Sequence, residues 1–380
     1  MRTIQSRSHP YAVEEFATLE AALASLGPLD QPHFLIDRFL LDRIRGACGQ
    51  GLPESRLLCL EASEHAKSYA ALERVFLDLL ERNLKRSGTL VVVGGGVLQD
   101  AGCFVASVLA RGIRWVLIPT TLLAQADSCI GSKSSINIGS FKNQIGTFYP
   151  PHRVLLVPEV LRTLPYDELR SGLGEVIKLQ LLSSEKGFEE LMEDLVGLER
   201  LPVELREPLL ARWVRRSMDV KQPVIEADEF DRGQRLLLNY GHTFGHAYES
   251  VTDYGIPHGI SVILGMLTAT VLSAELGMVP AAHCEKLFLR LRPWHEPYAD
   301  RLAAVGREAL LQALAKDKKN SATGLTCILT RGFGEMERMT LTPEQVTSLV
   351  WPTIGRLIGS RFSVGIMSEK SKIGLGSTSA

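Results

Sequence analysis

The chain has 380 residues, of which 45% are hydrophobic and 22% are charged. A chain of this length rarely folds around a single hydrophobic core, so two domains are expected. The formal net charge of -1 provides no overall positive field, which argues against a nucleic-acid partner.

The cysteines and the N-terminus indicate a cytoplasmic protein. Six cysteines are scattered without a Cys-x-x-Cys pair, which is typical of reduced thiols. The first residues, "MRTIQSRSHPYAVEEF", lack the apolar stretch of a secretory signal. The most apolar long segment starts at Ile260 but contains Ser, Thr and Gly and meets Glu275. We interpret it as a buried core helix rather than a membrane span.

Residues 89–119 have the order of a βαβ unit. An apolar run, "TLVVV", is followed by three glycines, by the helix-like "VLQDAGCFVASVLARG" and by a second apolar run, "IRWVLIP". Continuous apolar strands separated by a helix are typical of a parallel sheet. We therefore predict an α/β, Rossmann-like nucleotide-binding domain over residues 1–160.

The glycines Gly94 to Gly96 lie where this strand meets the helix. Free N–H groups at a helix N-terminus can hold a phosphate or pyrophosphate. The spacing is not Gly-x-Gly-x-x-Gly, so a turn that only needs positive φ stays an alternative. Asp100, one turn into the helix, either complements the helix dipole or lies near a nicotinamide.

The segment 119–151, "PTTLLAQADSCIGSKSSINIGSFKNQIGTFYPP", carries polar side chains among glycines and serines. Such side chains, together with free backbone donors, suit a small phosphorylated ligand. The polar members are Asp127, Lys133, Asn137, Lys142 and Asn143. Other basic residues follow at Lys221, Arg235, Lys318 and Lys319, each of which could equally be a surface charge.

From about residue 161 onward, helical periodicity replaces the strand-like runs. We predict a mainly α-helical, metal- and substrate-binding domain over residues 161–360 and a loosely ordered polar tail over 361–380. The apolar helix "SGLGEVIKLQLL" contains Glu175 and Lys178, three residues apart. Buried charges must pair or bind a ligand, so a salt bridge and a metal site are both open here.

Three histidines lie in "NYGHTFGHAYESVTDYGIPHG" at His242, His246 and His258. The first two are four residues apart on one helix face, a geometry in which two imidazoles can share a divalent ion. An open catalytic zinc site uses three protein ligands, often including a carboxylate. Core histidines without a metal stay the alternative on spacing alone.

Taken together, these segments resemble the sugar phosphate cyclases and, within that family, the 3-dehydroquinate synthases. The resemblance covers residues 61–334. It implies the two-domain fold of that family and an enzyme that uses NAD and a metal. The motifs, in the order of the family, are "GGGVLQDAGCFVA", "RGIRWVLIPTTLLAQADSCIGSKSSIN", "KNQIGTFYPP", "LPYDELRSGLGEVIK", "RLLLNYGHTFGHAYE", "PHG" and "DKKN".

The resemblance also implies roles for individual residues. Glu175, His242 and His258 would bind a zinc or cobalt ion. Arg111 would reach the pocket of a neighbouring subunit, which implies a homodimer. Catalytic roles are implied for His246, Lys133, Lys178, Asn239 and Arg235, with His246 facing the substrate rather than the metal. Further substrate contacts are implied for Asp127, Lys142, Asn143, Lys221 and one or both of Lys318 and Lys319. The residues that match the NAD site are Asp37, Glu64, Lys67, Gly94, Gly95, Gly96, Val97, Asp100, Thr120, Thr121, Thr163 and Glu168.

The chemistry implied by the resemblance is a lyase reaction without net redox change. NAD would oxidise a ring hydroxyl of a phosphorylated sugar acid, phosphate would leave by β-elimination, the hydride would return, and an aldol closure would form the carbocycle. The group that would hold the phosphate is Lys133, Lys142, Asn143, Asn239 and His246. Lys221 and Arg235 suit a substrate carboxylate, which favours 3-deoxy-D-arabino-heptulosonate 7-phosphate.

Three departures from the family pattern leave the substrate open. Gln99 stands where a glycine is common, "SCIGSKSSIN" has serines where "SSVGGKT" is typical, and Ile260 replaces an acid two residues after His258. The alternatives are cyclases of sedoheptulose 7-phosphate or glucose 6-phosphate, metal-dependent polyol dehydrogenases, and a paralogue kept for binding alone. The phosphate-binding cluster argues against the dehydrogenases, and the complete ligand set argues against the paralogue.

Overall fold

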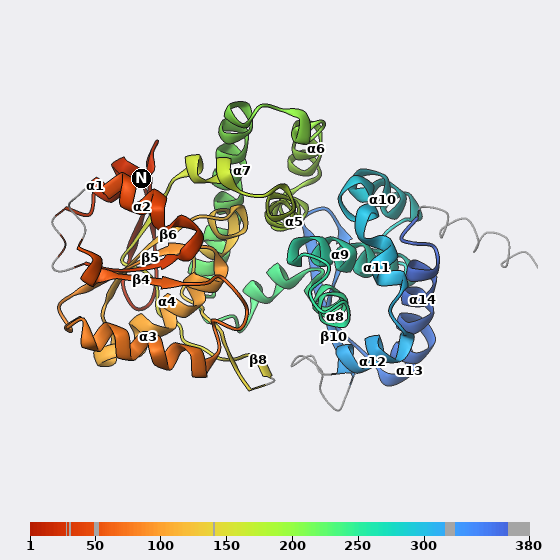
Figure 1. Ribbon diagram of the computed structural model, residues 1–380. Coiled ribbons are helices and arrows are strands. Elements are labelled where there is room, and N and C mark those ends of the chain that lie inside the picture. The colour runs from red at the N-terminus through yellow and green to blue at the C-terminus, as the bar shows by residue number, and fades with distance from the viewer. Residues whose placement is uncertain (28, 30–31, 49–52, 140, 316–323, 364–380) are drawn as a thin grey trace, which may run out of the picture. The chain divides into compact units, whose positions relative to one another are not determined.

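The computed structural model describes residues 1–380 except 28, 30–31, 49–52, 140, 316–323 and 364–380 (Figure 1). It divides into two compact units. The first contains Met1–Gly172 and Gly197–Gln234, and the second contains Leu173–Val196 and the chain from Arg235 onward. The division does not follow a single cut in the chain, so the domain limits at 160 and 360 stay a prediction. Of the expected polar tail, residues 361–363 alone are described.

The first unit is built on a twisted sheet. Among the described residues, seven strands form it in the order β1-β2-β9-β6-β5-β3-β4, and β1 is antiparallel to β2 while the other neighbours are parallel. The predicted strands around the glycines are β5 and β6, so the βαβ prediction is confirmed. The bounds are β1 (Arg2–Ile4), β2 (Tyr11–Glu15), β3 (His33–Asp37), β4 (Leu57–Leu60), β5 (Thr89–Gly94), β6 (Arg114–Pro119) and β9 (Arg153–Leu156).

Helices cover both faces of this sheet because its central strands are apolar on both sides. Val91 and Val93 of β5 belong to the core beneath α1 (Leu19–Ala24) and α2 (Leu41–Cys48). Val92 points to the other face, where a Cβ at Gly102 of α4 would lie 2.4 Å from its side chain. Figure 1 shows α3 (Tyr69–Glu81) and α4 (Gly96–Val108) together on that side.

Three further segments of the first unit carry predicted site residues. A π-helical turn, η5 (Ala124–Ser128), follows β6, and a short hairpin of β7 (Ile136–Ile138) and β8 (Phe141–Ile145) comes next. The 3-10 segment η6 (Pro158–Thr163) leads to α5 (Tyr166–Ser183). The long helix α7 (Val203–Ala227) packs against η5 and η6.

The second unit is mainly helical, as predicted, and also contains an antiparallel hairpin of β10 and β11. It contains the larger part of α5 and a buried central helix, α9 (His258–Glu275), with α8 and α10 against it. The remaining bounds are α6 (Glu185–Asp194), α8 (His242–Val251), α10 (Ala281–His295), α11 (Ala299–Ala303), α12 (Arg307–Ala315), β10 (Leu325–Gly332), β11 (Glu335–Leu341), α13 (Pro343–Gln345) and α14 (Trp351–Gly359). The fold class predicted from the sequence is confirmed.

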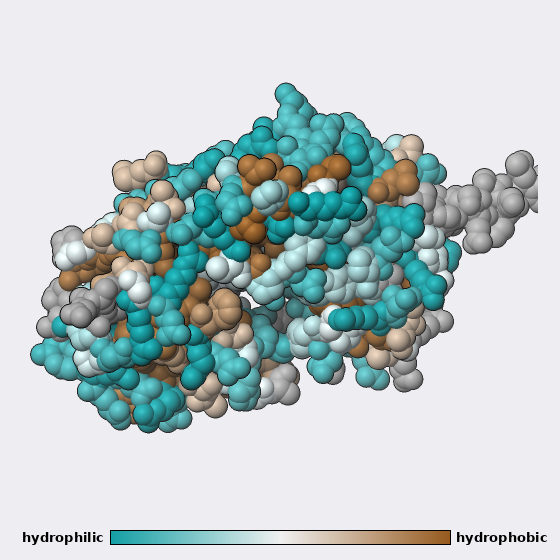
Figure 2. All heavy atoms as spheres, turned by 45° about the horizontal axis from the view of Figure 1, so that its top comes forward, coloured by the Kyte–Doolittle hydropathy of each residue, from teal (hydrophilic) through white to brown (hydrophobic). Residues whose placement is uncertain are grey.

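Helix α9 is the apolar segment that the sequence suggested as a core helix. Among the described residues, α9 is the one helix that is long and apolar enough to cross a membrane. However, 83% of its 18 residues are buried inside the structure. Every residue from Gly259 to Ser273 is buried. The core interpretation is therefore confirmed. The face in Figure 2 is mainly hydrophilic with scattered apolar patches, as expected for a chain with 22% charged residues.

Candidate active site

Glu175, His242 and His258 come together in the second unit. Glu175 Oε1 lies 3.1 Å from His258 Nε2 and 3.4 Å from His242 Nε2. One ligand atom from each residue lies within 4.8 Å of the others. A carboxylate oxygen and two imidazole nitrogens are a donor set typical of zinc and similar divalent ions, so these residues fit such a metal.

Close backbone contacts between helices produce this arrangement. A Cβ at Gly174 of α5 would lie 2.2 Å from the Gly259 carbonyl oxygen, and a Cβ at Gly265 of α9 would lie 1.9 Å from the Gly241 carbonyl oxygen. Gly245 of α8 is similarly close to Ser261, with 2.8 Å between its added Cβ and the carbonyl oxygen. Glycine permits these approaches because it has no side chain to separate the helices. Each ligand is adjacent to one of these contacts in the sequence.

The triad has supporting charges on both sides. Lys178 pairs with Glu175 Oε2, and its positive charge lowers the pKa of the Glu175 carboxyl well below its ordinary value despite burial. Glu249 Oε2 lies 3.2 Å from His258 Nδ1. Burial acts to lower the pKa of His258, but hydrogen bonds with Glu175 and Glu249 outweigh it and raise that pKa to about 10. Burial lowers the pKa of His242.

The geometry contains both arrangements that the spacing left open. The predicted Glu175–Lys178 salt bridge forms, and the same carboxylate also faces two histidines. His246 lies on the exposed side of α8, with its ring centroid 5.2 Å from that of His242. A second possible metal cluster, His246, Glu249 and His258, shares His258 with the first.

In the second unit, Asn239 donates to the Leu236 carbonyl at 3.1 Å and Arg235 is buried.

In the first unit, the predicted substrate residues form two ion pairs. Lys221 of α7 is buried, and its Nζ lies 2.5 Å from Asp127 Oδ1 and 2.6 Å from the Asp127 carbonyl oxygen. Lys133 Nζ lies 2.7 Å from Asp231 Oδ2. Each of these ammonium groups therefore lies against a carboxylate in the same unit.

Asn143, one of the predicted phosphate residues, and Asp100, predicted near the nicotinamide, belong to one hydrogen-bond network. Asp100 Oδ1 accepts from the Ser135 N–H at 3.1 Å, and the Ser135 hydroxyl donates to Asn143 Oδ1 at 3.1 Å. The Asn143 N–H donates to Asn137 Oδ1 at 2.9 Å. Lys142, beside Asn143 in β8, is partly exposed. Ser135 therefore connects Asp100 to Asn143.

The glycine turn has the features of a phosphate-binding helix start. Gly95 caps α4 and, among the described residues, no side chain caps this helix. A Cβ at Gly96 would meet no atom within 4 Å in the described part of the chain, whereas one at Gly95 would lie 2.7 Å from Thr121 Cγ2. None of Gly94 to Gly96, all of which are described, has a positive φ. The alternative that these glycines serve a positive φ is therefore wrong, and the turn fits a dinucleotide phosphate.

Next to this turn lies a buried lysine. Lys67 Nζ lies 3.0 Å from Asp100 Oδ2 and 3.5 Å from Glu64 Oε1. Burial opposes the charge of Lys67, but Asp100 and Glu64 outweigh it and raise its pKa. Burial raises the pKa of Asp100 although Lys67 is close. This cluster brings together three of the residues predicted to bind NAD.

The other predicted NAD residues are also in the first unit. Thr120 is buried at the end of β6, and the Thr121 hydroxyl accepts from the Ala124 N–H at 3.2 Å. Burial raises the pKa of Asp37, which accepts from the Phe39 N–H at 3.1 Å. Val97 is partly buried in the first turn of α4, and Glu168 is exposed.

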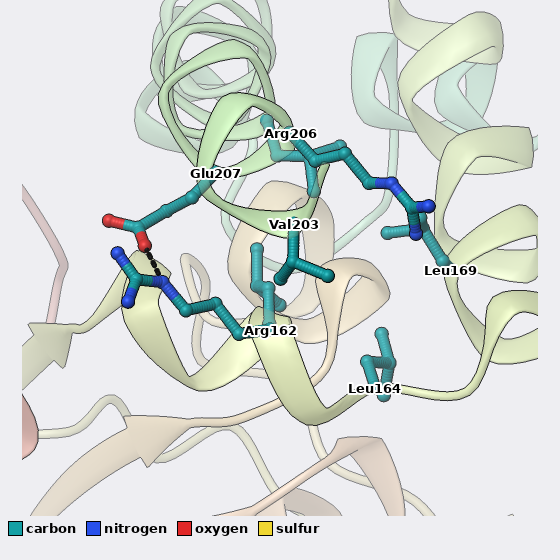
Figure 3. Close-up of a pocket in the computed structure, with 8 residues that line it drawn as sticks. Arg162, Leu164, Leu169, Val203, Arg206 and Glu207 are labelled. Carbon is teal, nitrogen blue, oxygen red and sulfur yellow. Dashed lines mark hydrogen bonds and ion pairs between the residues drawn. The ribbon is translucent and has the colours of Figure 1, made fainter. Parts of the chain in front are cut away.

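Leu164 and Leu169, which are next to Thr163 and Glu168 in the sequence, line a small cavity of about 20 Å³ (Figure 3). Its walls come from η6, the start of α5 and the start of α7, and they include Leu164, Leu169 and Val203. Arg162 and Glu207 pair at its edge (Figure 3). The cavity has room for little more than a water molecule, so it is a packing defect rather than a substrate pocket.

The remaining predicted substrate residues are Lys318, Lys319 and Arg111. Lys318 and Lys319 lie outside the described residues. Arg111 is exposed in a turn where Ala110, Arg111 and Gly112 all have positive φ, at 49°, 63° and 113°. Two consecutive non-glycine residues in the left-handed region are costly, and such strain accumulates at functional positions.

The structure adds residues that the motifs did not single out. Glu249 contacts His258, Asp231 contacts Lys133, and Ser135 connects Asp100 with Asn143. Glu249 lies seven residues after His242, two helical turns along the same helix face, and that spacing could have indicated it. No spacing rule links Asp231 to Lys133, which is 98 residues away in the chain.

Comparisons with known proteins show which family the chain resembles. Models of the N-terminal and C-terminal regions of 3-dehydroquinate synthase match residues 57–171 and 172–320. The 3-dehydroquinate synthase of Alkaliphilus metalliredigens is 34% identical over 302 residues, which is 78% of this chain and 83% of the relative. That of Paracoccus denitrificans is 40% identical over 293 residues, which is 75% of this chain and 78% of the relative.

Solved structures show the same fold. A 2-deoxy-scyllo-inosose synthase complexed with carbaglucose-6-phosphate, NAD+ and Co2+ superposes with a TM-score of 0.81 at 21% identity, covering 92% of this chain and 99% of that one. A 2-epi-5-epi-valiolone synthase from Streptomyces hygroscopicus with NAD+ and Zn2+ gives 0.79 at 24% identity, covering 94% and 100%. From the identity and coverage of the curated relatives, the chain belongs to the 3-dehydroquinate synthase family.

Proposed function

We propose that this chain is a 3-dehydroquinate synthase, which converts 3-deoxy-D-arabino-heptulosonate 7-phosphate to 3-dehydroquinate and phosphate. The observation that carries the proposal is the Glu175–His242–His258 cluster in a chain whose curated relatives have that activity. The cofactors are NAD and a divalent metal, zinc or cobalt. When bound, NAD takes up and returns a hydride, and the metal polarises the substrate oxygens.

The residues of the second unit have roles that follow from their contacts. Lys178 keeps Glu175 ionised, so the carboxylate is ready to accept a cation. Glu249 holds Nδ1 of His258, which directs Nε2 toward Glu175. His246 and Asn239 are assigned to the substrate phosphate, and the buried guanidinium of Arg235 is assigned to the carboxylate.

The residues of the first unit supply positive charge and dinucleotide contacts. Lys221, held by Asp127, is assigned to the substrate carboxylate. The phosphate is assigned to Lys133, Lys142 and Asn143. The start of α4 and the Lys67–Asp100 pair are assigned to NAD. Lys318 and Lys319 complete the proposed substrate contacts.

A homodimer in the cytoplasm completes the proposal. Arg111, exposed in a turn with three consecutive positive φ values, is the residue that the proposal places in the partner's pocket. Light scattering on the purified protein checks the oligomeric state. We expect the wild-type protein to be an active dimer. If Arg111→Ala loses activity but stays a dimer, the result supports a role of this arginine in the partner's pocket.

The test of the function is phosphate release by metal-loaded protein with NAD+, with NADH absorbance recorded in the same cuvette. We expect release from the heptulosonate phosphate without accumulation of NADH. Release from sedoheptulose 7-phosphate or glucose 6-phosphate instead would assign the chain to another sugar phosphate cyclase. Stoichiometric NADH formation would identify a dehydrogenase. His242→Ala serves as the control, since it should lose both metal and turnover.

A further inference from the structure

Gln99 ties two segments of the first unit together. It is buried in the first turn of α4, directly before Asp100. Its Nε2 donates to the Ser128 carbonyl at 2.6 Å, and its Oε1 accepts from the Ser128 hydroxyl at 2.7 Å. One side chain thus makes two hydrogen bonds to one residue, which fixes both the spacing and the orientation of α4 relative to η5.

The contact lies one residue from the Asp127–Lys221 pair. Ser128 is the last residue of η5, and Asp127 immediately before it accepts from Lys221 through both its side chain and its carbonyl. Because Lys221 is buried, its ammonium position depends on where η5 places Asp127. A displacement of Ser128 therefore moves the charge assigned to the substrate carboxylate.

Asp100, the neighbour of Gln99, holds the other end of the same segment. Its Oδ1 accepts from the Ser135 N–H at 3.1 Å. Two adjacent residues of α4, Gln99 and Asp100, are thus hydrogen-bonded to Ser128 and Ser135. In the sequence, Lys133 lies between these two serines. A glycine at position 99 could make neither bond to Ser128.

We propose that Gln99 is a positioning residue that sets the place of the Asp127–Lys221 pair and thereby the affinity for the anionic substrate. The proposal rests on the function proposed above, since it assigns Lys221 to the substrate carboxylate. A purely space-filling role predicts that methionine, which has a similar size and no hydrogen-bonding amide, replaces Gln99 without loss.

The test compares Gln99→Met, Gln99→Glu, Ser128→Ala and the double variant Gln99→Met/Ser128→Ala in NAD- and metal-loaded protein. Gln99→Met should raise the KM for the heptulosonate phosphate about tenfold, in line with two lost hydrogen bonds, with a smaller change in kcat and in the Kd of NAD. Gln99→Glu should fail to rescue, because a carboxylate cannot donate to the Ser128 carbonyl. The double variant should be no worse than Gln99→Met. Ser107→Ala, which removes a hydroxyl from the same helix, is the matched control.

Hydrogen exchange of residues 124–135 is the second readout. It should be faster in Gln99→Met and unchanged in Ser107→Ala. Unchanged exchange, or faster exchange with an unchanged KM, overturns the proposal. If wild-type protein releases no phosphate from the heptulosonate, the proposed function fails, and the exchange rates still decide whether Gln99 holds the segment.

Discussion

The contact between α8 and α9 allows a direct test of how the metal ligands are positioned. A Cβ at Gly265 would lie 1.9 Å from the Gly241 carbonyl oxygen and 2.7 Å from Gly245 N. Ordinary contact begins at 3.4 Å, so Gly265→Ala forces the backbones apart by about 1.5 Å at that point. His242 follows Gly241 directly, and His258 begins α9. The substitution should therefore displace one ligand relative to the other.

We expect two measurable effects of Gly265→Ala. The free energy of unfolding should fall by about 1–3 kcal/mol, the usual cost of overpacking. Metal affinity should fall by about tenfold or more, because a displacement above 1 Å is large compared with the tolerance of a coordination site. Denaturant unfolding and competition with a chromophoric chelator measure the two quantities.

Gly355→Ala is the matched control. Gly355 lies in α14 of the same unit, and a Cβ there would meet no described atom within 4 Å. This change should leave metal affinity unaltered and stabilise the protein by up to about 1 kcal/mol. If Gly265→Ala lost stability but bound metal with wild-type affinity, the glycine contacts would be ordinary packing and the reasoning would be wrong.

Three further substitutions test other parts of the site and fold. Arg235→Ala should impair turnover of the heptulosonate phosphate, mainly through a higher KM, far more than it impairs any residual turnover of a neutral sugar phosphate. Equal losses on the two substrates in steady-state assays would remove the assignment of Arg235 to the carboxylate. Asp100→Asn should weaken NAD binding about tenfold in fluorescence titrations by removing the charge beside Lys67, and an unchanged Kd would contradict that role. Burial lowers the pKa of His295 to about 4, below its ordinary value, so the unfolded chain binds more protons and stability falls as pH drops from 6.5 toward 4. In metal-free protein, His295→Leu should reduce the change of the free energy of unfolding with pH by up to about 1.4 kcal/mol per pH unit. Denaturant titrations at several pH values measure this dependence, and the same dependence in wild type and variant would refute the assignment.

The fold could be predicted from the sequence because it depends on local patterns. The apolar runs around Gly94 to Gly96 are continuous, as strands covered on both faces must be, and β5 and β6 formed there. The spacing of His242 and His246 predicted a shared helix face. Spacing alone could not tell which histidine joins Glu175, since that depends on where α5 and α9 meet α8. The resemblance supplied His258, and the geometry agrees with it.

Long-range contacts were beyond the sequence for a physical reason. Gly241, Gly245 and Gly265 carry no chemistry of their own, and their role appears only when two backbones are seen in contact. Likewise, Gln99 was recognisable as a departure from the family, but its partner Ser128 is 29 residues away. Periodicity identifies faces and ends of elements, whereas the partner across a contact depends on tertiary packing.

The departure at Ile260 raises the question of what supports His258 in this chain. Ile260 is fully buried, while Glu249 Oε2 lies 3.2 Å from His258 Nδ1. A carboxylate on the second imidazole nitrogen orients the ring and makes it a better metal ligand. Glu249→Gln keeps the shape of this side chain but removes its charge, so metal affinity should fall about 10- to 100-fold.

Chelator competition measures that loss without relying on turnover, and the exposed Glu285 of α10 provides the control, Glu285→Gln. An unchanged affinity in Glu249→Gln would mean that Glu175 and the helix contacts alone orient His258. A loss confined to Glu249→Gln would show that this chain supports its metal ligand from α8, where the carboxylate is already paired with the ring, and does not need an acid at position 260.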